Sequence, residues 1–164
     1  MPPRVWNTIM LKIKLVVVGN LKESYFREMT NEYLKRIQKF AKIEVKEVPE
    51  QSTSSAISIE KIKEIESKNV LNEIEGFSVL LDRNGENLTS EEFASFFNKK
   101  QIQGVSKITF VIGGSYGISE EVQDRFDMLL SFGKMTFPHQ LMRVILVEQI
   151  YRAMTILNKV QYHK

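Results

Sequence analysis

The sequence contains no cysteine among its 164 residues. Structural disulfides, thiolate nucleophiles and cysteine-ligated zinc are therefore excluded. Histidine is almost as scarce, with only two residues, His139 and His163. Neither of them stands in a recognisable cluster of carboxylates, so the sequence predicts no metal site.

Long apolar runs are also missing, and none approaches the roughly 20 residues that a membrane-spanning helix requires. The first ten residues, MPPRVWNTIM, lack the basic segment and apolar stretch of a secretory signal peptide. We therefore expect a cytoplasmic protein with no membrane partner. Residues 1–10 are expected to form an N-terminal extension, and residues 11–164 a single domain.

Positive charge is unevenly distributed along the chain, whose formal net charge is +3. From residue 134 to the end there is one acid, Glu148, and the basic residues there are Lys134, Arg143, Arg152, Lys159 and Lys164. An excess of cations at one end of the chain is typical of a nucleic-acid-binding surface. A helix with a solvated basic face explains the same pattern, so charge alone leaves both interpretations open.

Strand and helix patterns alternate along the domain. Short β-branched runs that end at turn residues predict strands over residues 11–18, 43–48, 77–81 and 107–112. Apolar residues at three- and four-residue spacing predict helices over residues 22–40, 57–74, 89–103, 119–130 and 139–157. Residues 82–85 read as a turn, and residues 130–137 as a strand or extended loop. This order predicts an α/β fold with a mostly parallel sheet and helices on both faces.

The most distinctive stretch is ITFVIGGSYG, residues 108–117, in which a strand pattern ends in glycines. Glycine allows the backbone to approach a ligand closely, and ligands of parallel sheets bind at the carboxyl ends of the strands. Residues 80–82 and 130–135 are expected at the same edge. Backbone, leucine and methionine with few charges suit a flat heteroaromatic ring, as in a nucleotide-like cofactor.

The residues alone leave several functions open. The phosphate-binding pattern Gly-Lys-Ser/Thr and the dinucleotide pattern Gly-x-Gly-x-x-Gly are both absent. Ser115, His139 and Asp82 could form a hydrolytic relay, but no nucleophile-elbow sequence supports it. A nucleotide-binding hydrolase and a non-catalytic module that binds RNA or the ribosome are the alternatives to a cofactor-dependent enzyme.

Three segments are more specific: VIGGSYG, LLSFGKMTFPHQLMRVILVEQIYRA and the terminal YHK. With KIKLVVVGNLKE and VLLDRNGENLTSEEFA, they resemble the RlmH family of SPOUT-class methyltransferases over nearly all of residues 11–164. The resemblance implies a homodimer that uses S-adenosyl-L-methionine to methylate N3 of a pseudouridine in 23S ribosomal RNA of the large subunit. It also implies a trefoil knot at the C-terminal side and, we expect, action on the assembled ribosome.

The resemblance implies a set of cofactor-binding residues that coincides with the three strand ends described above. They are Leu81, Gly113, Leu130, Ser131, Phe132, Gly133, Lys134 and Met135. Gly133 stands where relatives often carry serine, so a backbone contact is expected there.

Methyl transfer to N3 of a uracil-type ring requires the loss of a proton, which a general base would accept. His139 is the first candidate for this base, with Glu148 as the second. Arg143, one helical turn after His139, could hold a phosphate or stabilise the deprotonated base. Each has a structural alternative, because His139 could cap or pack the helix start and Arg143 could form a salt bridge within the dimer.

The end of the chain is the candidate RNA-binding region, since the resemblance suggests that the terminal YHK contacts RNA. Arg152 and Lys164 could bind phosphates, and Tyr162 could stack on a base. His163 completes this predicted group.

Overall fold

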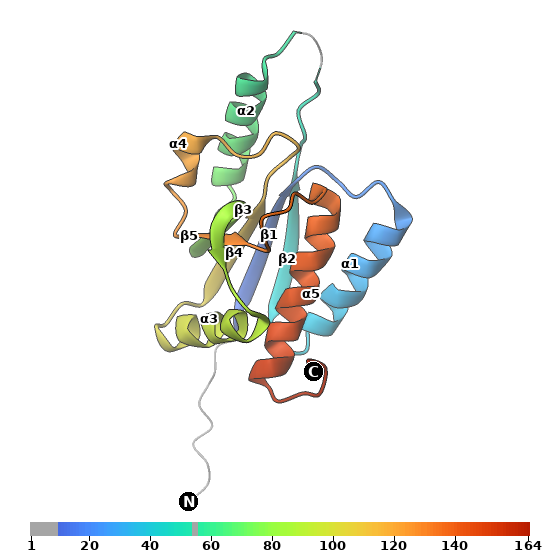
Figure 1. Ribbon diagram of the computed structural model, residues 1–164, viewed down its shortest axis with the longest axis vertical. Helices are drawn as coiled ribbons and strands as arrows, with labels where there is room; N and C mark the ends of the chain where they lie inside the picture. The colour runs from blue at the N-terminus through green and yellow to red at the C-terminus, as the bar shows by residue number, and fades with distance from the viewer. Residues whose placement is uncertain (1–9, 54–55) are drawn as a thin grey trace, which may run out of the picture.

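The computed structural model describes residues 10–53 and 56–164. Its centre is a parallel sheet of five strands in the order β2-β1-β4-β3-β5 (Figure 1). The strands are β1 (Lys12–Val18), β2 (Lys42–Val48), β3 (Phe77–Asn87), β4 (Lys107–Ile112) and β5 (Met128–Ser131). Most of the predicted extension, residues 1–9, lies outside the described residues.

Helices cover both faces of this sheet. One face is packed by α1 (Ser24–Ile37), α3 (Ser90–Ile102) and α5 (His139–Leu157), and the other by α2 (Ile59–Leu71) and α4 (Glu120–Gln123). The predicted α/β class with a parallel sheet is confirmed, whereas the knot stays a prediction. None of the helices within the described ranges has the length and apolar character needed to cross a membrane.

The core follows the two-residue period of a strand buried on both sides. In β1, Ile13, Leu15 and Val17 face the larger apolar cluster beneath α1, α3 and α5. Val16 and Val18 face the smaller cluster beneath α2 and α4. β1 is therefore an inner strand of the sheet that is buried on both faces.

Helix α3 begins as the sequence predicts. The hydroxyl of Thr89 accepts a hydrogen bond from the Glu92 N–H at 3.1 Å, and the Glu92 carboxylate accepts one from the Thr89 N–H at 2.9 Å. This capping box satisfies two backbone donors that the first turn of a helix leaves unpaired.

The predicted helix over residues 119–130 is wrong, because α4 ends at Gln123 and the chain then enters the edge strand β5. Asp127 makes this change of direction: its carboxylate accepts hydrogen bonds from the Ser78 N–H at 2.8 Å and hydroxyl at 3.2 Å. Val122, Phe126 and Leu129 have helical spacing, yet a turn and an edge strand bring them to one cluster.

The predicted turn at residues 82–85 lies within β3 instead. The pairing of β3 with β5 shifts between Leu81 and Glu86, which is the signature of a bulged strand. Gly85 permits the close approach, since a Cβ there would lie 2.5 Å from the carbonyl carbon of Leu129. The bulge carries Asp82 and Arg83 to the edge of the sheet where the candidate site lies.

Candidate functional site

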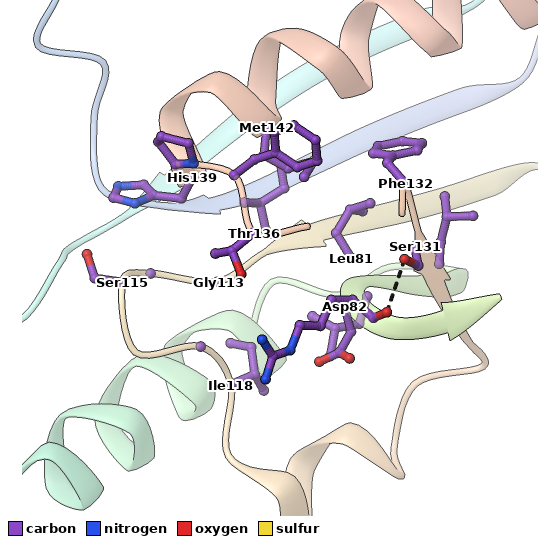
Figure 2. A pocket seen from close by; sticks show the side chains of 18 of the residues that line it. Leu81, Asp82, Gly113, Ser115, Ile118, Ser131, Phe132, Thr136, His139 and Met142 are labelled. Carbon is purple, nitrogen blue, oxygen red and sulfur yellow. Dashed lines mark hydrogen bonds between the residues drawn. The ribbon is translucent and has the colours of Figure 1, made fainter. Parts of the chain in front are cut away.

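The carboxyl ends of β3, β4 and β5 and the start of α5 surround a cleft of about 850 Å³. It is lined by residues 80–83, 112–118, 130–133 and 135–139 and by Met142. Figure 2 shows His139 and Met142 on one side and Asp82 and Ile118 on the other. Its volume lies within the range of about 300–1,000 Å³ that small-molecule sites occupy. The three strand ends selected from the sequence therefore do meet in one site.

The structure brings together nearly all of the predicted cofactor-binding residues. Those that line the cleft are Leu81, Gly113, Leu130, Ser131, Phe132, Gly133 and Met135. Lys134 lies between two lining residues but does not itself line the cleft. Contact of these residues with a cofactor stays a prediction.

The loop that follows β5 is fixed by the hydroxyl of Ser131, which is 2% exposed. This hydroxyl accepts a hydrogen bond from the Gly133 N–H at 3.1 Å, and it lies 2.9 Å from the Gly133 carbonyl oxygen and 3.2 Å from that of Arg83 (Figure 2). Gly133 has φ of +129°, a conformation that side chains other than glycine rarely adopt. The Ser131 side chain thus shapes the loop from within, joining it to the β3 bulge.

The glycine turn, residues 113–117, is closely packed from behind. A Cβ on Gly113 would lie 3.2 Å from Cγ1 of Ile118, and one on Gly114 would lie 3.0 Å from Cγ1 of Val18. Gly117 has φ of +79°, and its N–H donates a hydrogen bond to the Gly114 carbonyl at 3.0 Å. At Gly113 and Gly114 the space is already filled, so the backbone itself forms the wall of the cleft.

The two predicted catalytic residues do not lie together. His139 is the first residue of α5 and lines the cleft. Arg143 is 3% exposed and does not line the cleft, because its guanidinium donates hydrogen bonds to Glu47 Oε2 at 2.8 Å and to the Gly19 carbonyl at 3.0 Å. Arg143 thus forms a salt bridge, as its structural alternative predicted, but this salt bridge lies within one chain. It joins α5 to the carboxyl ends of β1 and β2.

Most of the predicted RNA-binding residues gather near the C-terminal end of α5. The guanidinium of Arg152 lies 5.0 Å from the centre of the Tyr162 ring and 3.2 Å from Nδ1 of His163. It also forms an ion pair with Glu148. Lys164, the last residue, is exposed. The terminal segment is therefore packed against the domain rather than detached from it.

The environment of this terminal segment changes the ionisation of its neighbours. Burial raises the pKa of Tyr162, and its hydrogen bonds to Tyr33 and Glu148 act in the same direction. The hydrogen bond from His163, whose Nε2 lies 2.6 Å from Glu91 Oε1, holds the pKa of Glu91 below its ordinary value. Tyr162 is thus kept as a neutral phenol that can donate a hydrogen bond.

Several residues escaped the sequence interpretation. Thr136 and Met142 line the cleft, and Met142 could have been found because it lies three residues after His139, on the same side of a helix. Glu66 is a buried acid on α2. The sequence feature that could have identified Glu66 is the four-residue spacing of Ile62, Glu66 and Val70. This spacing places a carboxyl group within the apolar stripe of that helix.

The described ranges contain no group of three or more His, Asp or Glu side chains arranged to hold a metal ion. The functional groups of the cleft are backbone, apolar side chains, several hydroxyl groups, one imidazole and the charges of Asp82 and Arg83. A parallel sheet with a ligand-sized cleft at its carboxyl edge is the arrangement in which α/β proteins bind small ligands.

Comparison with known proteins identifies the family of this chain. The family described as "Predicted SPOUT methyltransferase" matches residues 11–163. The proteins named ribosomal RNA large subunit methyltransferase H from Carboxydothermus hydrogenoformans, Enterococcus faecalis and Streptococcus pneumoniae are 47%, 45% and 45% identical to it. Each match covers 94% of this chain and 100% of the relative. The chain belongs to the SPOUT methyltransferase family.

Proposed function

We propose that this protein is an S-adenosylmethionine-dependent methyltransferase that acts on N3 of a pseudouridine in the 23S ribosomal RNA. The observation that carries the proposal is the cleft, in which three strand ends meet as the family resemblance implies. The names of relatives 45–47% identical over the whole domain support ribosomal RNA as the substrate. The cytoplasm, where ribosomes are found, is the proposed location.

The cleft fits the proposed cofactor. Leu81, Phe132 and Met142 supply apolar surface for an adenine ring, and the backbone of residues 113–117 can approach it closely because glycine leaves no side chain in the way. Asp82 and Arg83 offer one charge of each sign to the zwitterionic amino-acid end. When bound, S-adenosylmethionine supplies a methyl group activated by the positive sulfur, which departs as a neutral thioether.

The residues of this chain would then align the target and remove its proton. Methyl transfer requires N3, the methyl carbon and sulfur in line, and holding them so supplies much of the rate. His139, on the cleft wall, is the proposed base that accepts the N3 proton on a ring nitrogen. Arg143 would act as a positioning residue, because its bonds to Glu47 and Gly19 fix the first turns of α5 behind His139.

A second copy of the chain would complete the site. His139 and the terminal segment lie at opposite ends of α5 (Figure 1), whose 19 residues span about 28 Å at 1.5 Å per residue. The segment of one chain is therefore far from its own cleft. Met135, 79% exposed, and Tyr116, 38% exposed, leave apolar surface at the mouth of the cleft. A homodimer would cover this surface and carry the partner's terminal segment to the bound RNA.

The test incubates the purified protein with ribosomes that lack the modification and with S-adenosylmethionine labelled in its methyl group. The proposal expects label in the 23S RNA, recovered after digestion as N3-methylated pseudouridine by mass spectrometry. Faster labelling of whole ribosomes than of free 23S RNA supports action on the assembled ribosome. Cofactor binding without transfer would instead favour the non-catalytic RNA-binding module, and a methyl group on another atom would contradict the proposed specificity.

A further inference from the structure

Glu66 is a carboxylic acid buried behind the cleft rather than inside it. It is 1% exposed and lies on the buried face of α2. Its Oε2 accepts a hydrogen bond from the Gln51 N–H at 2.8 Å, whereas Oε1 has no hydrogen-bond partner in the part of the chain that the structure describes. Buried polar atoms without a partner are rare and call for an explanation.

The unpaired oxygen lies against the glycine turn. A Cβ on Gly114 would lie 2.9 Å from Oε1 of Glu66, so the carboxyl group occupies the space that a side chain at position 114 would need. Gly114 is not among the glycines with positive φ. Space, and not backbone conformation, is therefore what requires glycine at this position of the cleft wall.

Two further contacts hold the same turn from behind. Ser67, the residue after Glu66, accepts a hydrogen bond from the Ser119 N–H at 3.0 Å through its hydroxyl. The Ser115 hydroxyl donates a hydrogen bond to Glu50 at 3.3 Å. The turn thus rests on α2 and on the connection between β2 and α2, and Glu66 is the side chain that touches both the turn and that connection.

We propose that Glu66 is a positioning residue that sets the backbone of residues 113–117 for cofactor binding and couples this backbone to the β2–α2 connection through Gln51. The proposal rests on the proposed function, because cofactor affinity is one of its readouts. It gives a role to the start of the polar connection, where Glu50 and Gln51 make these contacts. Glu66 thus links Gln51 to the cleft wall through a buried side chain, beside the exposed contact between Glu50 and Ser115.

The direction of the Glu66 pKa shift guides the choice of a matched substitution for the binding experiment. Burial raises the pKa of its carboxyl group, the hydrogen bond from Gln51 opposes this, and the negative charge of Glu50 raises the pKa further. Burial and Glu50 therefore make the charged form of Glu66 less favourable than that of an exposed glutamate. Glutamine has nearly the same shape, is neutral and keeps a carbonyl oxygen to accept from the Gln51 N–H, whereas alanine removes the support.

The first experiment measures the Kd for S-adenosylmethionine by calorimetry, together with the Tm, for the wild type, Glu66→Gln and Glu66→Ala. Glu64→Gln, an exposed acid on the same helix, is the control. We expect Glu66→Gln to bind within about threefold of the wild type, and Glu66→Ala to bind about tenfold more weakly or worse, because small displacements of a binding wall are costly. A lower Tm for Glu66→Ala with unchanged affinity would reduce Glu66 to a structural role and overturn the proposal.

A double-mutant cycle tests the contact itself. Gly114→Ala is expected to weaken binding about tenfold by pushing against the carboxyl group. In the double variant Glu66→Ala/Gly114→Ala the clash with the carboxyl group is removed and only the 3.0 Å approach to Val18 Cγ1 remains. The loss of binding should therefore be smaller than the product of the two single losses, since contacting residues are not additive. Strictly multiplicative losses would contradict the proposed contact.

Hydrogen exchange without ligand separates this proposal from the proposed function. Glu66→Ala should speed exchange of the backbone amides of residues 113–117 relative to the wild type and to Glu64→Gln, because an unsupported turn opens more often. Unchanged exchange would overturn the proposal whether or not the cofactor binds. A wild type that binds no S-adenosylmethionine would overturn the proposed function but leave the exchange result decisive for Glu66.

Discussion

The phenol of Tyr162 donates a hydrogen bond to Glu148, with 3.1 Å between Oη and Oε1. The Tyr162 Oη also lies 3.4 Å from the hydroxyl oxygen of Tyr33. The Tyr162 ring packs edge-on against Tyr151, with 4.7 Å between the ring centres. The third residue from the end of the chain is therefore held by α1 and α5. In a homodimer, this arrangement would present Tyr162 and the neighbouring Arg152 in a fixed position.

Removing residues 162–164 should weaken methylation of ribosomes while leaving the Kd for S-adenosylmethionine within about twofold, since the segment lies far from the cleft of its own chain. Single-turnover methylation and calorimetry on the same preparation measure the two effects. Equal losses of methylation and of cofactor binding on truncation would refute this division of labour.

Tyr162→Phe should keep the ring but lose about 1–2 kcal/mol of unfolding free energy with its hydrogen bond to a carboxylate. Tyr25→Phe, at an exposed tyrosine, is the control.

His139→Gln should lower kcat by about a hundredfold, which is the contribution expected from a general base. The Kd for the cofactor should change little, because the apolar and backbone walls remain. Single-turnover methylation and calorimetry on the same preparation measure the two quantities. Unaltered kcat in His139→Gln would refute His139 as the base.

Arg143→Ala should lower the free energy of unfolding by about 2–3 kcal/mol, since it removes two hydrogen bonds and a buried aliphatic stem. Glu47→Gln should cost less, because an amide oxygen can still accept from the guanidinium. Urea unfolding of both variants measures the difference. If Arg143 acts by positioning α5, Glu47→Gln should also reduce kcat slightly; a large loss of kcat in Arg143→Lys without loss of stability would indicate direct contact with RNA instead.

Gly85→Ala should destabilise the protein by about 1–3 kcal/mol by overpacking and should also weaken cofactor binding. The new Cβ would lie within 2.7 Å of the backbone of Leu129 and Leu130, which leads directly into the cleft loop. Gly104→Ala is the matched control: its φ of +83° costs about 1–2 kcal/mol in open space, away from the cleft. Thermal unfolding and calorimetry together should show cofactor loss only in Gly85→Ala.

Glu66 should make stability depend on pH. Because burial raises its pKa in the folded state, the folded protein holds this proton more tightly than the unfolded chain. The resulting stabilisation is present below the ordinary glutamate pKa of about 4.3 and is lost as pH rises through the folded-state pKa, at up to about 1.4 kcal/mol per pH unit. Urea unfolding from about pH 4 to pH 8 should therefore show the wild type losing stability relative to Glu66→Gln. Parallel curves would mean that the pKa of this carboxyl group is the same in the folded and unfolded states.

The sequence was sufficient for the architecture wherever local pattern and burial agree. The strands at residues 107–112 and 77–81 were found because β-branched runs stop at turn residues. Their convergence was also predictable, because parallel strands share one carboxyl edge. The edge strand β5 was predicted only in part: residues 130–137 were interpreted as a strand or extended loop, but Met128 and Leu129 were assigned to the preceding helix. The buried residues there have helical spacing, and β5 itself is only four residues long.

Pairings between distant segments were beyond the sequence. Arg143 is separated from its partners Glu47 and Gly19 by 96 and 124 positions, and nothing local distinguishes it from a cation that faces a ligand. The same holds for Glu66 and Gly114, whose contact depends on how closely α2 approaches the turn. Such contacts follow from three-dimensional packing, which a one-dimensional pattern does not encode.

Every residue that lines the cleft lies between Leu80 and Met142. From the earlier part of the chain, Glu66 touches the cleft wall from outside, and Gly19 and Glu47 hold Arg143 on α5 behind it. Evolution or engineering can therefore alter the first half, by substitution or by insertion into the β2–α2 connection, without replacing a group that meets the substrate. The chemical identity of the enzyme and the efficiency with which it works are, in this fold, properties of different stretches of sequence.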